Sequence, residues 1–100
     1  MRDHNYFIYI LTNLNRTVLY TGVTNDLSIR LTQHIEGVNK TSFTSKYKCH
    51  FLIYYEHFQY IVDAIDREKE IKGWSRKKKE DLIATENKYW RFLNDEVMET

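Results

Sequence analysis

The chain of 100 residues contains no proline, three glycines and a single cysteine, Cys49. One cysteine excludes an internal disulfide framework and a zinc site built from several cysteines, and it fits a reducing compartment. No stretch approaches the roughly 20 apolar residues of a membrane-spanning helix. The polar residues 1–5 lack the apolar centre of a signal peptide. These absences predict a cytoplasmic protein without a membrane partner, and the length predicts a single domain over residues 1–100.

Charge is nearly balanced overall but unevenly distributed. Fifteen basic and fourteen acidic residues leave a net charge of +1, which by itself indicates no partner. Residues 67–79 contain seven basic and two acidic side chains, a net +5, whereas residues 80–100 contain two basic and six acidic ones, a net −4. The only concentrated basic segment is therefore 67–79, and a nucleic-acid interface would use it.

Aromatic and β-branched residues predict three strands. Residues 6–11 are apolar at every position, which indicates a central strand covered on both faces. A turn over residues 13–16 and a second short strand over 17–21 complete a hairpin. Residues 51–55 form the third predicted strand.

Helix signals fill the rest of the chain. Thr24, Asn25 and Asp26 are candidate N-caps for a helix of about eleven residues that ends at Gly37. Further helices are expected over residues 60–72, from the Ser75 cap to about residue 84, and over 88–97, whereas 38–48 reads as a loop or short irregular helix. The predicted fold is α+β, a three-stranded antiparallel sheet flanked by helices in the order β-β-α-β-α-α-α.

Two features of the later helices are unusual for purely structural helices. Glu68 shares a helix face with Ile61, Ala64 and Ile65, so it is either an edge residue that reaches water or a carboxylate directed into a cleft as a metal ligand or base. The helix after Ser75 begins with consecutive cations, which oppose the helix dipole unless an anion binds there. These cations are Arg76, Lys77, Lys78 and Lys79.

A third feature links the hairpin to the first helix. Arg30 and His34 are four residues apart and share a helix face. Tyr9 and Tyr20 precede them on the two adjacent hairpin strands. Each of these residues alone is typical of a protein surface or a packed core, but the four together indicate a functional site.

The spacing of Tyr9, Tyr20, Arg30 and His34, with Glu68 on a later helix, resembles the GIY-YIG nuclease superfamily. The two motifs are present as Phe7-Ile8-Tyr9 and Tyr20-Thr21-Gly22. The segment AIDREKEIKGWSRKKKEDLI is similar to small stand-alone bacterial members related to the N-terminal domain of the excision-repair nuclease excinuclease C. The resemblance extends over about residues 5–84, and residues 85–100 are left as a C-terminal helix.

The resemblance implies an endonuclease that hydrolyses phosphodiesters in DNA, as in DNA repair, with one divalent metal ion, Mg²⁺ or Mn²⁺. RNA is not excluded as a substrate. Tyr9 and Tyr20 would line the active site, one of them as the base that activates water. Arg30 would stabilise the phosphate transition state, His34 would contact the phosphate or move a proton, and Glu68 would hold the metal. Four cations would bind flanking phosphates: Lys72, Arg76, Lys77 and Lys78.

The sequence departs from the family pattern at three points. Phe7 replaces the glycine of the first motif, and Thr21 replaces an aliphatic residue in the second. The asparagine that many members carry near the end of the domain has two candidates, Asn87 and Asn94. No length remains for an added targeting domain, so a protein partner for targeting is possible and the oligomeric state is open.

Two alternatives to a nuclease remain. One is a non-catalytic nucleic-acid-binding module that uses residues 67–79. The other is an interaction module that docks a partner through Trp90 and the acidic C-terminal segment. The enzyme is favoured because every catalytic position that can be matched is filled.

Overall fold

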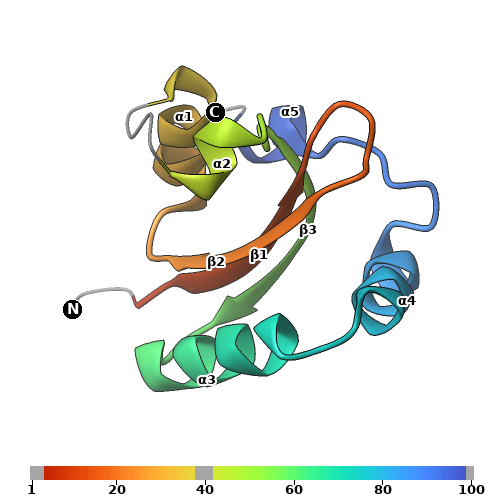
Figure 1. Cartoon of the computed structure of the whole chain (residues 1–100). Helices are drawn as coiled ribbons and strands as arrows, with labels where there is room; N and C mark the ends of the chain where they lie inside the picture. The colour runs from red at the N-terminus through yellow and green to blue at the C-terminus, as the bar shows by residue number, and fades with distance from the viewer. Residues whose placement is uncertain (1–3, 38–41, 99–100) are drawn as a thin grey trace.

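The fold is an antiparallel sheet between two layers of helices, seen in a computed structural model that describes residues 4–37 and 42–98 (Figure 1). The sheet order is β2-β1-β3, with β1 in the centre. The elements are β1 (Tyr6–Thr12), β2 (Leu19–Thr24), α1 (Leu27–Glu36), α2 (Phe43–Lys46), β3 (Phe51–Phe58), α3 (Ile61–Lys72), α4 (Arg76–Glu86) and α5 (Asn94–Met98). The predicted α+β class with a three-stranded antiparallel sheet is confirmed.

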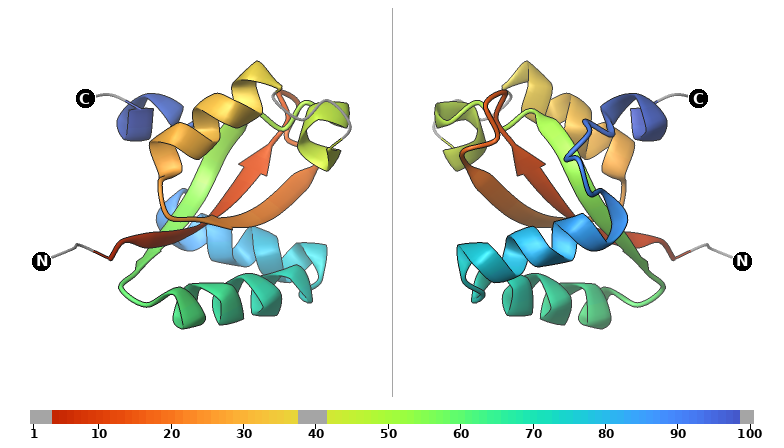
Figure 2. Two further views of the ribbon diagram at one scale, coloured as in Figure 1. Left: turned by 90° about the vertical axis from the view of Figure 1, so that its left-hand side faces the viewer. Right: turned by 90° about the vertical axis from the view of Figure 1, so that its right-hand side faces the viewer.

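The central strand explains why residues 6–11 are apolar throughout. Ile8 and Ile10 point to the layer of α3 and α4, whereas Tyr9 and Leu11 point to the layer of α1 and α5. All four side chains are almost fully buried. Figure 2 shows the two helical layers on opposite faces of the sheet. Because alternate residues of a strand face opposite sides, a strand covered on both sides has no solvent-facing position.

The predicted caps of two helices are present. The Asp26 carboxylate accepts a hydrogen bond from the Ile29 amide at 3.0 Å, and Gly37 ends α1 in the left-handed conformation, with φ 64°. Ser75 accepts from the Lys78 amide at 3.2 Å and begins α4. Short polar side chains at these positions satisfy amides that have no partner within the helix.

The second strand lies later in the chain than predicted. The side chain of Asn13 accepts hydrogen bonds from the amides of Thr17 and Val18, at 2.8 and 3.1 Å, and keeps them in the turn. β2 therefore begins at Leu19 rather than at residue 17. It continues to Thr24, because that residue still pairs with Phe7 of β1.

The predicted C-terminal helix over residues 88–97 is wrong for most of its length, and only α5 is helical. The buried side chain of Asn87 donates to the carbonyls of Ile53 and Arg91 and accepts from the Arg91 amide. Asn94 accepts from the Leu52 amide at 2.8 Å and donates to the His50 carbonyl at 2.9 Å. The two asparagines attach this segment to the free edge of β3, and that pairing replaces a helix.

The connection before β3 contains the short helix α2, which the predicted element order did not include. Ser42 caps it by accepting from the Ser45 amide at 3.2 Å. Residues 38–41, the first part of the segment expected to be a loop or short helix, lie outside the described residues. Within the described ranges, no helix is long and apolar enough to cross a membrane.

The interior contains one side-chain polar atom without a partner among the described residues, the hydroxyl of Thr21. Thr21 is 4% exposed and pairs with Ile10 across the strands. Valine has nearly the same shape but needs no hydrogen bond. We expect Thr21→Val to raise the free energy of unfolding by about 1 kcal/mol, measured by urea denaturation. A loss of stability would show that the hydroxyl has a partner in solution.

Candidate active site

The first component of the site is the phenol of Tyr9, which projects from the middle of β1. Its side chain is 1% exposed. Gly22 lies opposite it on β2, and a Cβ atom added there would stand 2.5 Å from Tyr9 Cζ. No side chain fits in that space, so the glycine of the second motif is required by the tyrosine of the first.

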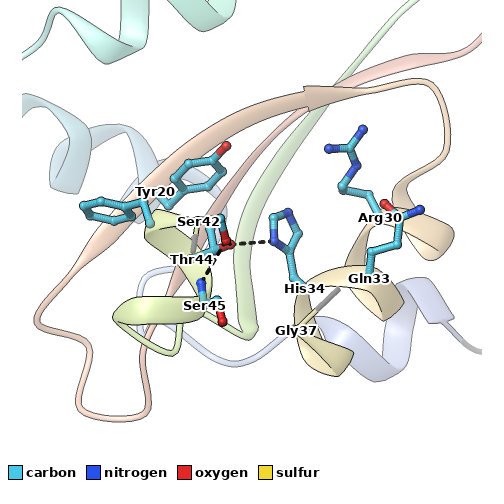
Figure 3. A pocket seen from close by; sticks show the side chains of 9 residues that line it. Tyr20, Arg30, Gln33, His34, Gly37, Ser42, Thr44 and Ser45 are labelled. Atoms are coloured by element: carbon cyan, nitrogen blue, oxygen red, sulfur yellow. Dashed lines mark hydrogen bonds between the residues drawn. The ribbon is translucent and has the colours of Figure 1, made fainter. Parts of the chain in front are cut away.

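A chain of hydrogen bonds leads away from this phenol. The Tyr9 hydroxyl lies 3.0 Å from Nε2 of His34, on α1. The other ring nitrogen, Nδ1, lies 3.0 Å from the hydroxyl of Thr44, which is 3.1 Å from the hydroxyl of Ser42. Figure 3 shows His34 directed at the α2 segment through these contacts. Both ring nitrogens are thereby held in place.

The protonation states of Tyr9 and His34 determine which group donates each of these hydrogen bonds. Burial raises the pKa of Tyr9 well above its ordinary value, Tyr20 and Glu68 add to the rise, and Arg30 opposes it. Burial lowers the pKa of His34 to about 4, with a further contribution from Arg30. At neutral pH the phenol is therefore a donor and the imidazole is neutral. Nε2 accepts from Tyr9, and Nδ1 carries the proton donated to Thr44.

An open cavity of about 340 Å³ lies beside this chain. Its walls come from β2, α1 and the α2 segment, and Figure 3 shows its side chains. Arg30 and His34 line one side of the cavity, and Tyr20 lies on the other side with Ser42, Phe43 and Thr44. The ring centroids of Tyr9 and Tyr20 are 6.3 Å apart, and that of His34 lies within 6 Å of each.

Glu68 reaches the same region from the opposite helical layer. Its side chain is 16% exposed, and its Oε2 atom is 3.5 Å from Nζ of Lys72, one turn later on α3. Nζ of Lys72 also lies 5.9 Å from the centroid of the Tyr20 ring. The Glu68 charge also raises the pKa of Tyr9, so the two side chains lie within electrostatic range. Of the five residues predicted to be catalytic, three line the cavity: Tyr20, Arg30 and His34. Tyr9 lies behind His34 on the central strand, and Glu68 approaches from α3 beside Lys72.

The donor set limits what kind of metal site is possible. No group of three or more His, Cys, Asp or Glu side chains capable of holding a metal occurs in the described parts of the chain. Among the five site residues that the sequence resemblance indicated, Glu68 alone has a carboxylate. Mg²⁺ retains several waters and binds through one or two carboxylates together with substrate phosphates, so a single partly buried glutamate fits such an ion.

The cations predicted to bind phosphates have intramolecular partners. Arg76 donates to the carbonyls of Thr17 and Arg16, at 2.7 and 3.2 Å, and so ties the start of α4 to the β1–β2 turn. Lys77 pairs with Asp81 at 2.9 Å, and Nζ of Lys78 lies 4.3 Å from the Trp74 ring centroid. Of these four cations, Lys72 is the one that lies beside predicted site residues, Glu68 and Tyr20.

Sequence reasoning missed Thr44, which holds the far side of the His34 ring. Thr44 is 3% exposed although it lies in a run of Lys, Ser and Thr residues that reads as a surface segment. No local pattern distinguishes it from its neighbours. The two asparagine candidates, Asn87 and Asn94, both hydrogen-bond to the backbone of β3 or of the segment beside it, at the opposite edge of the sheet from β2.

Comparison with known proteins agrees with this arrangement. Residues 5–81 match the family described as the GIY-YIG catalytic domain. The chain belongs to the GIY-YIG family. A UPF0213 protein of Bacillus pumilus is 36% identical over 80 residues, which are 80% of each chain. A UPF0213 protein of Natronomonas pharaonis is 35% identical over 82 residues, 82% of this chain and 94% of the relative.

A solved relative has the same fold. The solution NMR structure of a UPF0213 protein from Bacillus halodurans gives a TM-score of 0.56 at 29% identity, with 86% of this chain and 89% of the other covered. The relatives of this GIY-YIG protein are thus small bacterial and archaeal UPF0213 proteins of similar length.

The low pKa of His34 predicts how stability depends on pH. The unfolded chain protonates this ring near its ordinary pKa of about 6.5, whereas the folded GIY-YIG protein protonates it only near 4. Between these values the unfolded state binds more protons, so the free energy of unfolding falls as the pH is lowered. We expect a loss of about 1–2 kcal/mol across this window, after allowance for solvent screening of the half-buried ring.

Urea denaturation of His34→Gln between pH 4 and 7 measures this contribution, since the variant lacks the titrating group. The matched control is His57→Gln, because His57 is exposed and hydrogen-bonds only to Asn5 among the described residues. The control is expected to keep the wild-type pH dependence. Identical slopes for His34→Gln and the wild type would contradict the prediction.

Proposed function

We propose that this GIY-YIG protein is a metal-dependent endonuclease that hydrolyses phosphodiester bonds in DNA with little sequence preference. The observation that carries the proposal is an open cavity lined by Tyr20, Arg30 and His34. Behind it the Tyr9 phenol lies 3.0 Å from the His34 imidazole, and the partly buried Glu68 carboxylate is close enough to raise the pKa of that phenol. The sequence resemblance to the N-terminal domain of excinuclease C favours DNA repair intermediates as substrates. RNA carries the same phosphodiester and belongs in the same assay.

Two side chains would act on the phosphate through charge. Arg30 lies in the cavity wall, where its guanidinium can stabilise the negative charge that develops on the phosphate oxygens. Glu68 would hold one Mg²⁺ or Mn²⁺ ion, whose chemistry is to stabilise the same charge as a Lewis acid. The Lys72 ammonium, now paired with Glu68, would turn to a flanking phosphate. Lys77 and Lys78 would bind phosphates further along the strand, with Arg76 at the start of their helix.

The Tyr9–His34 pair would move the proton of the attacking water. The water gives its proton to the Tyr9 oxygen as that phenol passes its own proton to Nε2 of His34, and hydroxide attacks the phosphorus. The P–O bond to the leaving sugar oxygen breaks, and the proton taken up by His34 passes through solvent to that oxygen. The products are a phosphate monoester and a free hydroxyl, and His34 is neutral again. Nε2 of His34 is placed to accept this proton because it already receives the phenol proton as a hydrogen bond. Tyr20, in the cavity wall, would contact the bound strand.

Cleavage tests the proposal directly. We expect Glu68→Ala to reduce Mg²⁺-dependent cleavage of labelled DNA by about a thousand-fold or more, because a bound metal contributes several kcal/mol to transition-state stabilisation. Asp66→Ala is the matched control, since Asp66 is an exposed carboxylate on the same helix. The assay compares single-stranded, duplex, flapped and branched DNA, with RNA, in Mg²⁺, Mn²⁺ or EDTA.

Arg30→Ala is expected to reduce cleavage to a similar extent while the protein stays folded. Cleavage that survives both Glu68→Ala and Arg30→Ala would contradict this active site. Salt-sensitive binding without any cleavage by the wild type would instead favour a non-catalytic nucleic-acid-binding module.

Thr44 supplies a separate test as a positioning residue. Thr44→Val removes the hydroxyl that holds Nδ1 of His34 and should lower kcat by about ten-fold or more. A positioned acid or base typically raises the rate by about 10²–10⁴-fold, and misplacing the His34 ring should lose part of that increase. KM should change little, because Thr44 is almost fully buried and its hydroxyl is engaged with His34 and Ser42. Thr44→Ser keeps the hydroxyl and should restore kcat. Equal losses in both variants would assign Thr44 to packing alone.

A further inference from the structure

Two aromatic side chains on the outside of the α2 segment are unusually exposed. Phe43, the first residue of α2, is 46% exposed, and Tyr47, the residue after its last turn, is 43% exposed. Their ring centroids lie 4.6 Å apart. Scattered exposed apolar residues are common on protein surfaces, but these two contact each other and form one surface, the aromatic platform (Phe43 and Tyr47).

The aromatic platform is continuous with the candidate active site. The rings of Tyr20 and Phe43 stack with their centroids 5.9 Å apart and their planes 27° from parallel. Phe43 lines the same cavity as Tyr20 and His34. Three rings therefore follow one another outward from the site, from Tyr20 through Phe43 to Tyr47.

Positive charge lies at both ends of this row of rings. Nζ of Lys72 is 5.9 Å from the Tyr20 centroid at the inner end, and Nζ of Lys46 is 5.4 Å from the Tyr47 centroid at the outer end. Arg30 faces the cavity between α1 and the platform. Aromatic rings combined with flanking cations are what proteins use to bind single-stranded nucleic acid, since bases stack on the rings and phosphates pair with the cations.

We propose that the aromatic platform stacks unpaired bases of single-stranded DNA beside the phosphate held in the cavity. This inference rests on the proposed nuclease function and specifies its substrate class. Duplex DNA keeps its bases stacked inside the helix and presents no free base face to Phe43 or Tyr47. Only a single strand, a flap or an unpaired end can reach both the platform and the cavity.

Binding in EDTA tests the platform without any cleavage step. We expect Phe43→Ala and Tyr47→Ala each to weaken binding of a labelled single strand by about five-fold or more, as loss of base stacking does. Binding of a fully paired duplex should be unchanged. Fluorescence anisotropy in low-salt buffer measures both affinities.

Three controls separate stacking from other contributions. Tyr89→Ala removes an aromatic ring that is 78% exposed and lies outside the cavity, so it should have no effect. Phe43→Leu keeps an apolar side chain without a ring and should lose affinity, whereas Phe43→Trp should retain it. A strand with abasic sites has the same backbone charge but no bases, so Phe43→Ala should not weaken its binding.

Several results would contradict the proposal that the aromatic platform stacks bases. Equal losses for single strand and duplex, wild-type affinity in Phe43→Leu, or weaker binding of the abasic strand by Phe43→Ala would each exclude base stacking. Failure of the nuclease proposal is distinguishable, because it appears as absent or Glu68-independent cleavage.

Discussion

The Tyr9 hydroxyl is buried on the α1 face of the sheet, and among the described residues its hydrogen-bond partner is His34. A buried hydroxyl without a partner destabilises the folded state, so strand and helix must meet at this distance. The same phenol occupies the space where a side chain at position 22 would stand. One tyrosine thus determines the glycine beside it, the orientation of the imidazole and, through His34, the need for Thr44.

The site forms at an edge of the sheet because only there can both helical layers reach the same substrate. Tyr9, Arg30 and His34 belong to the layer of α1, whereas Glu68 and Lys72 come from α3 on the other face. β2 is the edge strand between them and contributes Tyr20. The opposite edge, along β3, is covered by the segment that Asn87 and Asn94 attach. A cavity of about 320 Å³ lies there too, but none of the predicted catalytic residues lines it.

The electrostatic arrangement separates the two halves of the proposed reaction. On the α1 side, burial keeps the phenol protonated and the imidazole neutral, which makes a proton-transfer pair. On the α3 side, the Glu68 carboxylate holds a lysine at 3.5 Å and is suited to hold a metal ion in its place. Arg30 acts on both members of the pair and faces the cavity that a phosphate would enter.

The sequence by itself determined the elements with strong local signals: the apolar central strand, the Asp26 and Ser75 caps, the Gly37 stop and the motif spacing that brings Tyr9, Tyr20, Arg30, His34 and Glu68 together. The strand, the caps and the stop follow from backbone preferences and periodicity within a few residues, whereas the grouping of the five site residues is what the resemblance to the GIY-YIG family implied. Tertiary structure alone decided the extended segment after α4 and the burial of Thr44. The extended segment depends on hydrogen bonds from Asn87 and Asn94 to the backbone of β3, and the burial of Thr44 depends on its hydrogen bond to the His34 ring. Both partners belong to other elements, so local sequence patterns do not predict them.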